Sequence, residues 1–168
     1  MQPYVPISAL TNMSRQKTAY VTGGASGIGL ALVKMLVSRD IKVAISDLNL
    51  PGAQAAAQSF KSGQVIAFEV NTASWNSQVS AFENALHALG DRIDYVYPIA
   101  GIGERVSIPN DTRAKGFVKP DLTVLDVDLS GTFYTFSLAV QQMRRQEKDE
   151  SGFRGKSACL SSWDALPG

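Results

Sequence analysis

Short apolar runs alternate along this chain with longer segments whose apolar residues recur at helical spacing. The short runs are rich in Val, Ile and Ala and predict strands at Thr18–Thr22, Ile41–Ser46, Gln64–Phe68, Asp94–Ile99 and Ser157–Ser161. The longer segments predict helices at Gly27–Ser38, Pro51–Ser62, Ser74–Leu89 and Leu122–Arg145. Because strands that alternate with helices form parallel sheets covered on both faces, the pattern predicts an α/β fold.

Right-handed crossovers between parallel strands narrow the topology further. They predict a doubly wound, Rossmann-type sheet of about five strands in the order 3-2-1-4-5. A ligand crevice is then expected beyond the carboxyl ends of the first and fourth strands, where the winding reverses. We assign residues 17–168 to this single domain and expect residues 1–16, which hold Pro3 and Pro6, to be a flexible arm. Residues 102–121 read as a long loop.

Two of the predicted helices carry large apolar side chains on one face. The sets are Trp75, Val79, Phe82, Leu86 and Leu89 in the first, and Leu122, Leu125, Leu129, Phe133, Phe136, Val140 and Met143 in the second. Such faces are typical of helices that pack on a core. We therefore expect Trp75 and the phenylalanines to be core residues and not parts of a ligand site. The single histidine, His87, is expected to face solvent.

A glycine-rich segment, Thr-Gly-Gly-Ala-Ser-Gly-Ile-Gly at 22–29, joins the first strand to the first helix. Glycine lets the backbone turn tightly and approach a bulky group closely. The N–H groups and the dipole at the helix start then form a seat for a pyrophosphate. This context favours a dinucleotide site over a plain tight turn. The candidate binding residues are Gly23, Ser26, Gly27, Ile28 and Gly29.

Further candidates lie where the other strands end. Asp47 ends the second strand, and its carboxylate is placed to accept the adenosine ribose hydroxyls and to repel a 2′-phosphate, which favours NAD over NADP. The alternative for Asp47 is a helix cap ahead of Pro51. The remaining strand-end candidates are Leu48, Glu69, Val70, Ala100 and Gly101.

Composition removes several other classes of function. The chain has 168 residues, 45% apolar and 18% charged with a net charge of +1, which is typical of a globular domain and argues against nucleic acid as a partner. Its single cysteine, Cys159, allows no intrachain disulfide and suits a reducing compartment, so we expect a cytoplasmic protein. No apolar run is long enough for a membrane span, residues 1–16 lack the apolar core of a secretory signal, and no ligand cluster has metal spacing.

On these residues the chain resembles the short-chain dehydrogenase/reductase family over about residues 16–162. The glycine segment matches the family's cofactor turn, and Glu69-Val70 resembles the Asp-Val pair that flanks adenine. Ala100-Gly101 matches the end of the Asn-Asn-Ala-Gly segment. The stretch 126–131 is similar to the family's Asn-containing helix, and 160–162 to the strand with the catalytic serine. The likeness is greatest to fungal members similar to hydroxyprostaglandin dehydrogenase.

The resemblance implies an NAD(P)-dependent oxidoreductase that interconverts a secondary alcohol and a ketone on a small molecule, as in secondary metabolism. It implies that Ser162 hydrogen-bonds the substrate oxygen, and that Asp128 stands where the family uses a relay Asn. A plain strand-end role for Ser162 and a structural role for Asp128 are the alternatives. Pro98 and Ile99 also replace the family's two asparagines.

The family's Tyr-x-x-x-Lys pair would fall beyond Gly168, so we expect this chain to lack the C-terminal part of the family fold. A second hypothesis is therefore an NAD-binding module without redox activity, or a cyclase or isomerase on the same scaffold, because a fold alone does not choose a function. An open edge at the fifth strand and an uncovered face of the long helix favour association, either as a homo-oligomer or with a longer relative.

Overall fold

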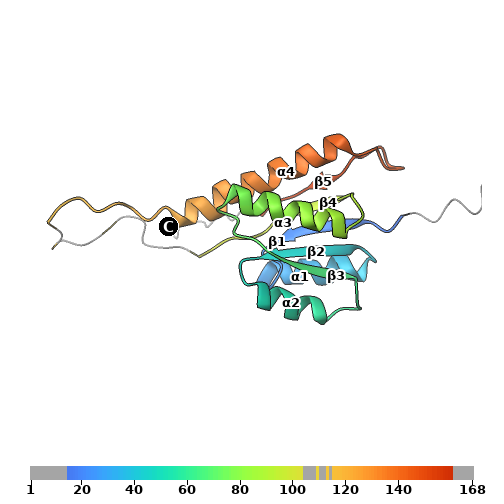
Figure 1. Cartoon of the computed structure of the whole chain (residues 1–168), viewed down its shortest axis with the longest axis horizontal. Coiled ribbons are helices and arrows are strands. Elements are labelled where there is room, and N and C mark those ends of the chain that lie inside the picture. The colour runs from blue at the N-terminus through green and yellow to red at the C-terminus, as the bar shows by residue number, and fades with distance from the viewer. Residues whose placement is uncertain (1–14, 104–108, 110–112, 114, 161–168) are drawn as a thin grey trace, which may run out of the picture.

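The computed structural model describes residues 15–103, 109, 113 and 115–160. Five parallel strands form one sheet in the order β3-β2-β1-β4-β5 (Figure 1). The strands are β1 (Thr18–Thr22), β2 (Lys42–Asp47), β3 (Val65–Glu69), β4 (Tyr95–Pro98) and β5 (Lys156–Ser157). This order confirms the predicted doubly wound α/β fold, and it places the reversal of winding between β1 and β4.

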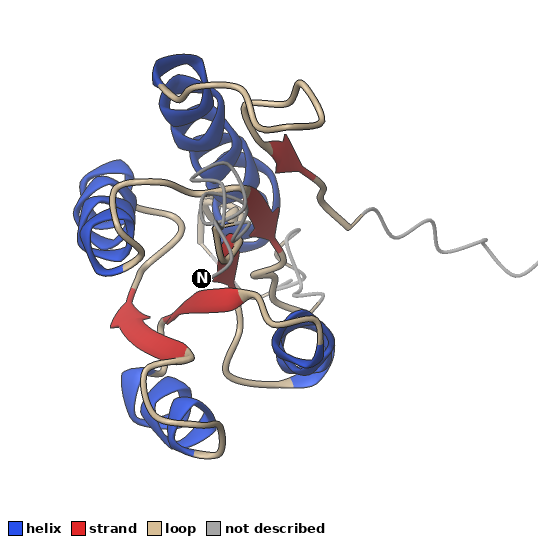
Figure 2. Cartoon of the chain, turned by 90° about the vertical axis from the view of Figure 1, so that its right-hand side faces the viewer, coloured by secondary structure: helices blue, strands red, loops and turns tan. Residues whose placement is uncertain are grey.

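Helices cover both faces of the sheet (Figures 1 and 2). They are α1 (Gly27–Ser38), α2 (Leu50–Gln58), α3 (Trp75–Ala88) and α4 (Thr132–Arg145), and a π-helix, η2 (Leu125–Gly131), runs directly into α4. The helices α1 and α2 lie on one face, and α3 and α4 lie on the other. Each face therefore has its own apolar core.

The strand β1 shows how one sequence serves both cores. Ala19 and Val21 pack in the core under α1 and α2, whereas Tyr20 between them packs under α3 and α4 against Phe82, with ring centroids 5.1 Å apart. All five residues of β1 are buried. A central parallel strand is buried on both faces, which is why this run reads as continuously apolar and not as alternating.

A buried carboxylate connects the segments at the end of the sheet where the strands begin, which we call its amino edge. Asp94, whose side chain is 4% exposed, accepts hydrogen bonds from Arg15 (2.7 and 2.8 Å), from Arg92 (3.0 Å) and from the N–H of Thr18 (2.9 Å). Gln16 donates to Asp40 at 2.9 Å. The described end of the expected N-terminal arm thus contacts the sheet, and residues 1–14 lie outside the described part of the chain.

Three element predictions need correction. The predicted helix 122–145 contains the π-helix η2, and its supposed core face is largely exposed, with Phe133 64% and Phe136 46% exposed. Trp75 is also exposed, so of the aromatic residues assigned to the core only Phe82 is buried. The predicted helix 51–62 is shorter in the structure, where α2 ends at Gln58. The predicted strand 157–161 is observed as β5, which pairs with β4 through Lys156 and Ser157. The helix α4 instead buries Thr135 and Ala139, because its other side contacts the sheet.

Candidate active site

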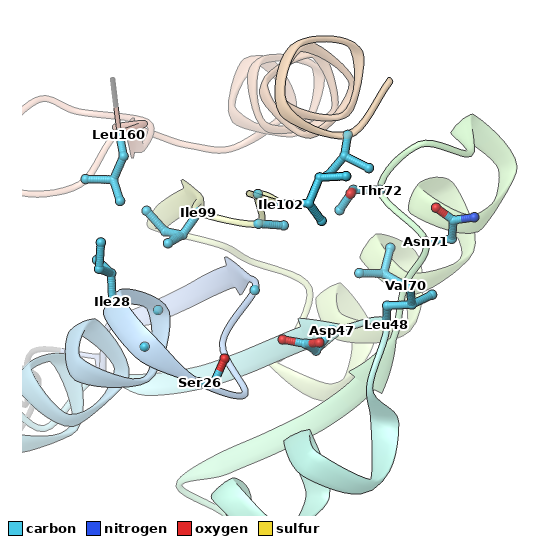
Figure 3. A pocket seen from close by; sticks show the side chains of 16 residues that line it. Ser26, Ile28, Asp47, Leu48, Val70, Asn71, Thr72, Ile99, Ile102 and Leu160 are labelled. Atoms are coloured by element: carbon cyan, nitrogen blue, oxygen red, sulfur yellow. The ribbon is translucent and has the colours of Figure 1, made fainter. Parts of the chain in front are cut away.

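A cavity of about 490 Å³ lies at the carboxyl ends of the strands, where the winding reverses (Figure 3). Ten of the predicted binding residues line it: Gly23, Ser26, Gly27, Ile28, Gly29, Asp47, Leu48, Val70, Ala100 and Gly101. Asp47 and Leu48 lie at one end beside Val70 and Asn71, and Ile28 and Leu160 lie at the other. Its volume falls within the range of about 300–1,000 Å³ for small-molecule sites.

The glycine turn forms one wall of this cavity. A Cβ atom on Gly29 would lie 2.0 Å from the carbonyl oxygen of Gly23, so only glycine allows the helix to start this close to the turn. The first helical bond of α1 runs from Leu30 N–H to the oxygen of Ser26 (3.0 Å), which leaves the amides of residues 27–29 at the open helix end. The side chain of Ser26 makes no capping hydrogen bond. These donors suit an anionic group.

Asp47 links the end of β2 to the glycine turn. Its Oδ2 accepts a hydrogen bond from Ala25 N–H (3.1 Å), and its Oδ1 accepts one from Asn49 N–H (3.0 Å). The carboxylate therefore has a fixed orientation at the edge of the cavity. The cap of α2 is provided by Asn49, whose side chain accepts from Gly52 N–H, so capping is not the task of Asp47.

Thr22 fixes the second wall. Its hydroxyl oxygen, on a residue that is 1% exposed, accepts hydrogen bonds from the N–H groups of Ile99 (3.1 Å) and Ala100 (3.2 Å). Those two amides follow β4 directly, where Pro98 ends the strand. The bonds turn the chain after β4 across the end of β1, and this turn brings Ala100 and Gly101 into the cavity.

The open helix end, the fixed carboxylate and the position of the cavity are those expected of a dinucleotide site. The family model described as short chain dehydrogenase matches residues 17–152. The chain belongs to this family. A short-chain dehydrogenase is expected to have the sheet order and the glycine turn seen here. The groups at the cavity fit a nicotinamide dinucleotide, since amides and a hydroxyl face one part of it and a fixed carboxylate faces another.

Curated relatives of this short-chain dehydrogenase include fungal and animal proteins. It is 36% identical to "NADP-dependent dehydrogenase M3" of Phoma sp. over 86% of this chain and 44% of the relative. It is 34% identical to "NADP-dependent dehydrogenase clz5" of Cochliobolus lunatus over 84% of this chain and 51% of the relative. Human "3-hydroxyacyl-CoA dehydrogenase type-2" is 33% identical over 89% and 57%. The chain thus spans about half the length of the curated relatives it matches.

Solved structures share the fold. A 3-ketoacyl-(acyl-carrier-protein) reductase from Brucella melitensis, solved in complex with NADH, superposes with a TM-score of 0.65 at 24% identity. The match covers 77% of this chain and 51% of that one. At this identity the likeness supports the Rossmann-type fold of the short-chain dehydrogenase.

The other predicted site residues have different positions. Glu69 ends β3, is exposed and does not line the cavity. Asp128 lies beside the cavity on η2, where its Oδ1 accepts a hydrogen bond from Ile102 N–H (2.9 Å). Ser162 lies outside the described residues. His87 is 77% exposed at its side chain and bonds Asp91 at 2.8 Å, away from the cavity.

Six lining residues were missed by the sequence reasoning: Asn71, Thr72, Ile99, Ile102, Val127 and Leu160. Four of them adjoin residues that had been singled out at the ends of β3 and β4, so extending each strand-end candidate by two residues would have found them. Val127 and Leu160 stand in the stretches 126–131 and 160–162, which the resemblance had singled out without naming either as a binding residue. The geometry of η2 brings Val127 into the lining, and the path of the chain after β5 brings in Leu160.

Few ionisable groups lie at the cavity among the described residues. Burial raises the pKa of Tyr20 to about 12, partly offset by Ser46, so this hydroxyl stays protonated inside the core. Among the described lining residues, Asp47 is the only one with an ionisable side chain. No group of three His, Cys, Asp or Glu side chains that would hold a metal occurs in the described ranges. Within those ranges, no helix is long and apolar enough to cross a bilayer.

Proposed function

We propose that this chain binds NAD in the cavity at the sheet's switch point, as part of an oxidoreductase that interconverts a secondary alcohol and a ketone on a small molecule. The observation that carries the proposal is the cavity itself, in which the glycine turn, Asp47 and the segment after β4 face one another. Membership of the short-chain dehydrogenase family supports the reaction class. The fungal relatives named as dehydrogenases support the same reaction class, and we propose that the small molecule belongs to secondary metabolism.

Each wall has a separate task in this proposal. The amides of residues 27–29 and the Ser26 hydroxyl bind the pyrophosphate. Asp47 binds the adenosine ribose, and Leu48 and Val70 provide apolar surface beside the adenine. When bound, the nicotinamide supplies hydride transfer. The protein orients the cofactor and excludes water around it, with Ile28, Ile99 and Leu160 forming the apolar end of the cavity.

We assign Asp128 and Ser162 to the substrate end. Asp128 touches the segment after β4 through Ile102 N–H, so it lies where a carboxylate can hold a water molecule or a polar substrate group. A Cβ on Gly101 would lie 3.5 Å from Asp128 Oδ1, which places the carboxylate against the cavity wall. Ser162 follows Leu160 by two residues and is proposed to donate a hydrogen bond to the substrate oxygen.

The preference for NAD over NADP rests on Asp47. A 2′-phosphate beside this carboxylate would place like charges together, and none of the described lining residues is Lys or Arg. Two relatives are named NADP-dependent, which makes the cofactor the point where this chain is proposed to differ from them. The single cysteine suits a reducing compartment, and we place the protein in the cytoplasm.

Turnover tests the redox proposal. The purified chain is mixed with NAD and a panel of secondary alcohols, and NADH formation is followed by absorbance, with NADH binding measured separately by fluorescence. Turnover that disappears when Asp128 is changed to Ala supports a role for that carboxylate in the reaction. Binding without any turnover favours the second candidate, an NAD-binding module or a non-redox enzyme. The observation behind that candidate is that Asp47 is the only ionisable group among the described lining residues, and it lies at the adenosine end.

We also propose that the chain associates through the exposed apolar face of η2 and α4, with a second copy as the occupant. This face, the α4 stripe, consists of Leu125 and Leu129 of η2, Phe133 and Phe136 of α4, and Leu122 shortly before η2, all exposed. Asp126 lies near the amino end of η2, and Arg144 and Arg145 lie at the carboxyl end of α4. Antiparallel pairing of two such helices would join each acidic end to the other copy's basic end. A longer relative with the same stripe is the alternative partner.

A further inference from the structure

Gln78 is a buried glutamine on α3 that contacts the cavity walls without lining the cavity. It is 1% exposed. Its Nε2 donates to the carbonyl oxygens of Thr72 (2.7 Å) and Gly131 (2.8 Å), and its Oε1 accepts from the hydroxyl of Thr135 (2.6 Å). Both amide protons and the amide oxygen are therefore used.

These partners permit only one orientation of the amide. Carbonyl oxygens only accept hydrogen bonds, so a flipped amide would set Oε1 against two acceptors in a buried place. The Thr135 hydroxyl, as a donor to Oε1, adds to this preference. A buried amide with all of its groups bonded is rigid, and its loss leaves unpaired polar groups behind.

The two carbonyl groups belong to two different walls. Thr72 lines the cavity in the loop that follows β3. Gly131 ends η2, which carries Val127 in the cavity lining and Asp128 on the amide of Ile102. Gln78 thus bridges two carbonyl oxygens that would otherwise repel each other, and through them it joins the loop after β3 to the π-helix.

The backbone contact between these walls is too close for a side chain. A Cβ atom on Gly131 would lie 2.9 Å from the carbonyl oxygen of Thr72 and 3.1 Å from its Cβ. The π-helix is rare and is found mostly as single turns inside α-helices. At the end where η2 meets α4, Gln78 donates to the carbonyl oxygen of Gly131, and the Thr135 hydroxyl holds the Gln78 amide in place.

We infer that Gln78 is a positioning residue that sets the separation of the loop after β3 from η2, and with it the affinity of the adenosine end of the cavity. The inference rests on the proposed NAD site for its ligand. Gln78 holds the loop after β3, which begins at Val70. This loop lies beside Asp47 at the adenosine end, because Val70 N–H donates to the carbonyl oxygen of Asp47 (3.0 Å). A shift of this loop therefore moves the wall that faces adenosine.

The chain offers a matched control in Gln146. This glutamine is 5% exposed and clamps the opposite end of α4, where it accepts from Ile93 N–H (2.8 Å) and donates to the carbonyl oxygens of Ile93 (3.0 Å) and Arg154 (2.6 Å). Its contacts lie at the amino edge of the sheet, away from the cavity. Replacing either glutamine by Met removes a similar set of buried hydrogen bonds at similar volume.

The first test uses the chain without ligand. Hydrogen exchange is measured at the amides of Val70 and Ile102, which are bonded to Asp47 and Asp128. Gln78→Met is expected to speed exchange at both amides by about 10-fold, whereas Gln146→Met leaves them within about twofold of the wild type. Equal exchange in the two variants would overturn the positioning role. The exchange measurement tests the positioning role of Gln78 even if the chain binds no nucleotide.

The second test titrates the same variants with NADH and with ADP. Gln78→Met is expected to weaken both ligands by about 10-fold, and Gln146→Met by less than about twofold. Loss of NADH affinity with unchanged ADP affinity would overturn the assignment to the adenosine end. A wild-type chain that binds neither ligand would refute the proposed function, and the exchange rates alone would then decide whether Gln78 positions the two walls.

A milder variant covers the case in which Gln78→Met does not fold. Thr135→Val removes the hydroxyl that orients the amide and keeps both bonds from Nε2. We expect about threefold faster exchange at Ile102 and about threefold weaker ADP binding. Wild-type values for both measurements would contradict the inference.

Discussion

At the scale of single residues, Asp47 has a structural role that is observed and a role in ligand choice that we propose. Hydrogen bonds from Ala25 N–H and Asn49 N–H hold both of its oxygens, so its charge has a fixed place beside the glycine turn. A charge held in place discriminates better than a mobile one, because no side-chain rotation relieves the repulsion of a second anion. In the proposed function, the residue that would decide the cofactor preference therefore also shapes the turn.

The substitution Asp47→Asn tests this role. Asn keeps the shape and one acceptor oxygen but removes the charge, so NADPH affinity should rise relative to NADH by about 10-fold. The Kd values are measured by the fluorescence of each reduced cofactor. Asp40→Asn is the control, since Asp40 is exposed at the opposite edge and its φ of 58° suits Asn. Unchanged discrimination in Asp47→Asn would show that Asp47 does not set the cofactor preference.

At the scale of elements, a few buried polar side chains hold the backbone at the ends of the strands. The strand and helix pattern predicted the sheet order and ten of the cavity residues, because parallel strands bring their carboxyl ends to one edge. The π-helix escaped prediction, since the hydrogen bond from Gln78 on α3 to the carbonyl oxygen of Gly131 is a contact between distant parts of the chain that no local pattern indicates. The exposure of Phe133 escaped for a similar reason: periodicity identifies an apolar face but not what covers it.

The amino edge of the sheet depends on the charge of Asp94. Burial opposes that charge, but hydrogen bonds from Arg15, Thr18 N–H and Arg92 outweigh it and hold the pKa of Asp94 below its ordinary value of 3.8. A lowered folded-state pKa contributes stability above the ordinary value, and this contribution is lost as the pH falls through the folded value. The chain should therefore lose stability below about pH 4.

Asp94→Asn tests the contribution of that charge. The variant should lower the free energy of unfolding at pH 7 by about 2 kcal/mol, and the difference from the wild type should shrink below about pH 4. Urea unfolding between pH 3 and 7 measures both effects. Asp91→Asn is the control, since the side chain of Asp91 is 74% exposed and pairs only with His87 among the contacts described. A constant difference across this pH range would contradict the assignment.

At the scale of the whole molecule, two surfaces formed by the described residues are candidates for contact with partners. The α4 stripe exposes large apolar side chains along one helix face, and β5 pairs with β4 through only two residues at the edge of the sheet. The cavity and the stripe are close to each other, since η2 carries both Val127 of the lining and Leu125 and Leu129 of the stripe. Association through the stripe would therefore support the π-helix from its outer side.

The double substitution Leu129→Ser with Phe133→Ser tests the stripe. The wild-type chain should be a dimer at micromolar concentration, and the double variant should be a monomer, because two central apolar contacts are lost. Light scattering after size-exclusion chromatography gives the mass. Phe117→Ser is the control, since Phe117 is fully exposed outside the helix. A monomeric wild type, or a dimer that survives the double change, would refute pairing through this face.

The affinity of the chain for NADH in a matched pair of glycine variants tests the dinucleotide site most directly. Gly27 (φ 51°) lines the cavity, and Gly63 (φ 77°) lies between α2 and β3; a Cβ at either position meets no protein atom within 4 Å. Alanine at either site costs a similar backbone strain of about 1 kcal/mol. We predict saturable NADH binding by the wild type and by Gly63→Ala, and at least about 10-fold weaker binding by Gly27→Ala. Equal affinities in the two variants, or no binding by the wild type, would contradict the central claim that this cavity holds the dinucleotide.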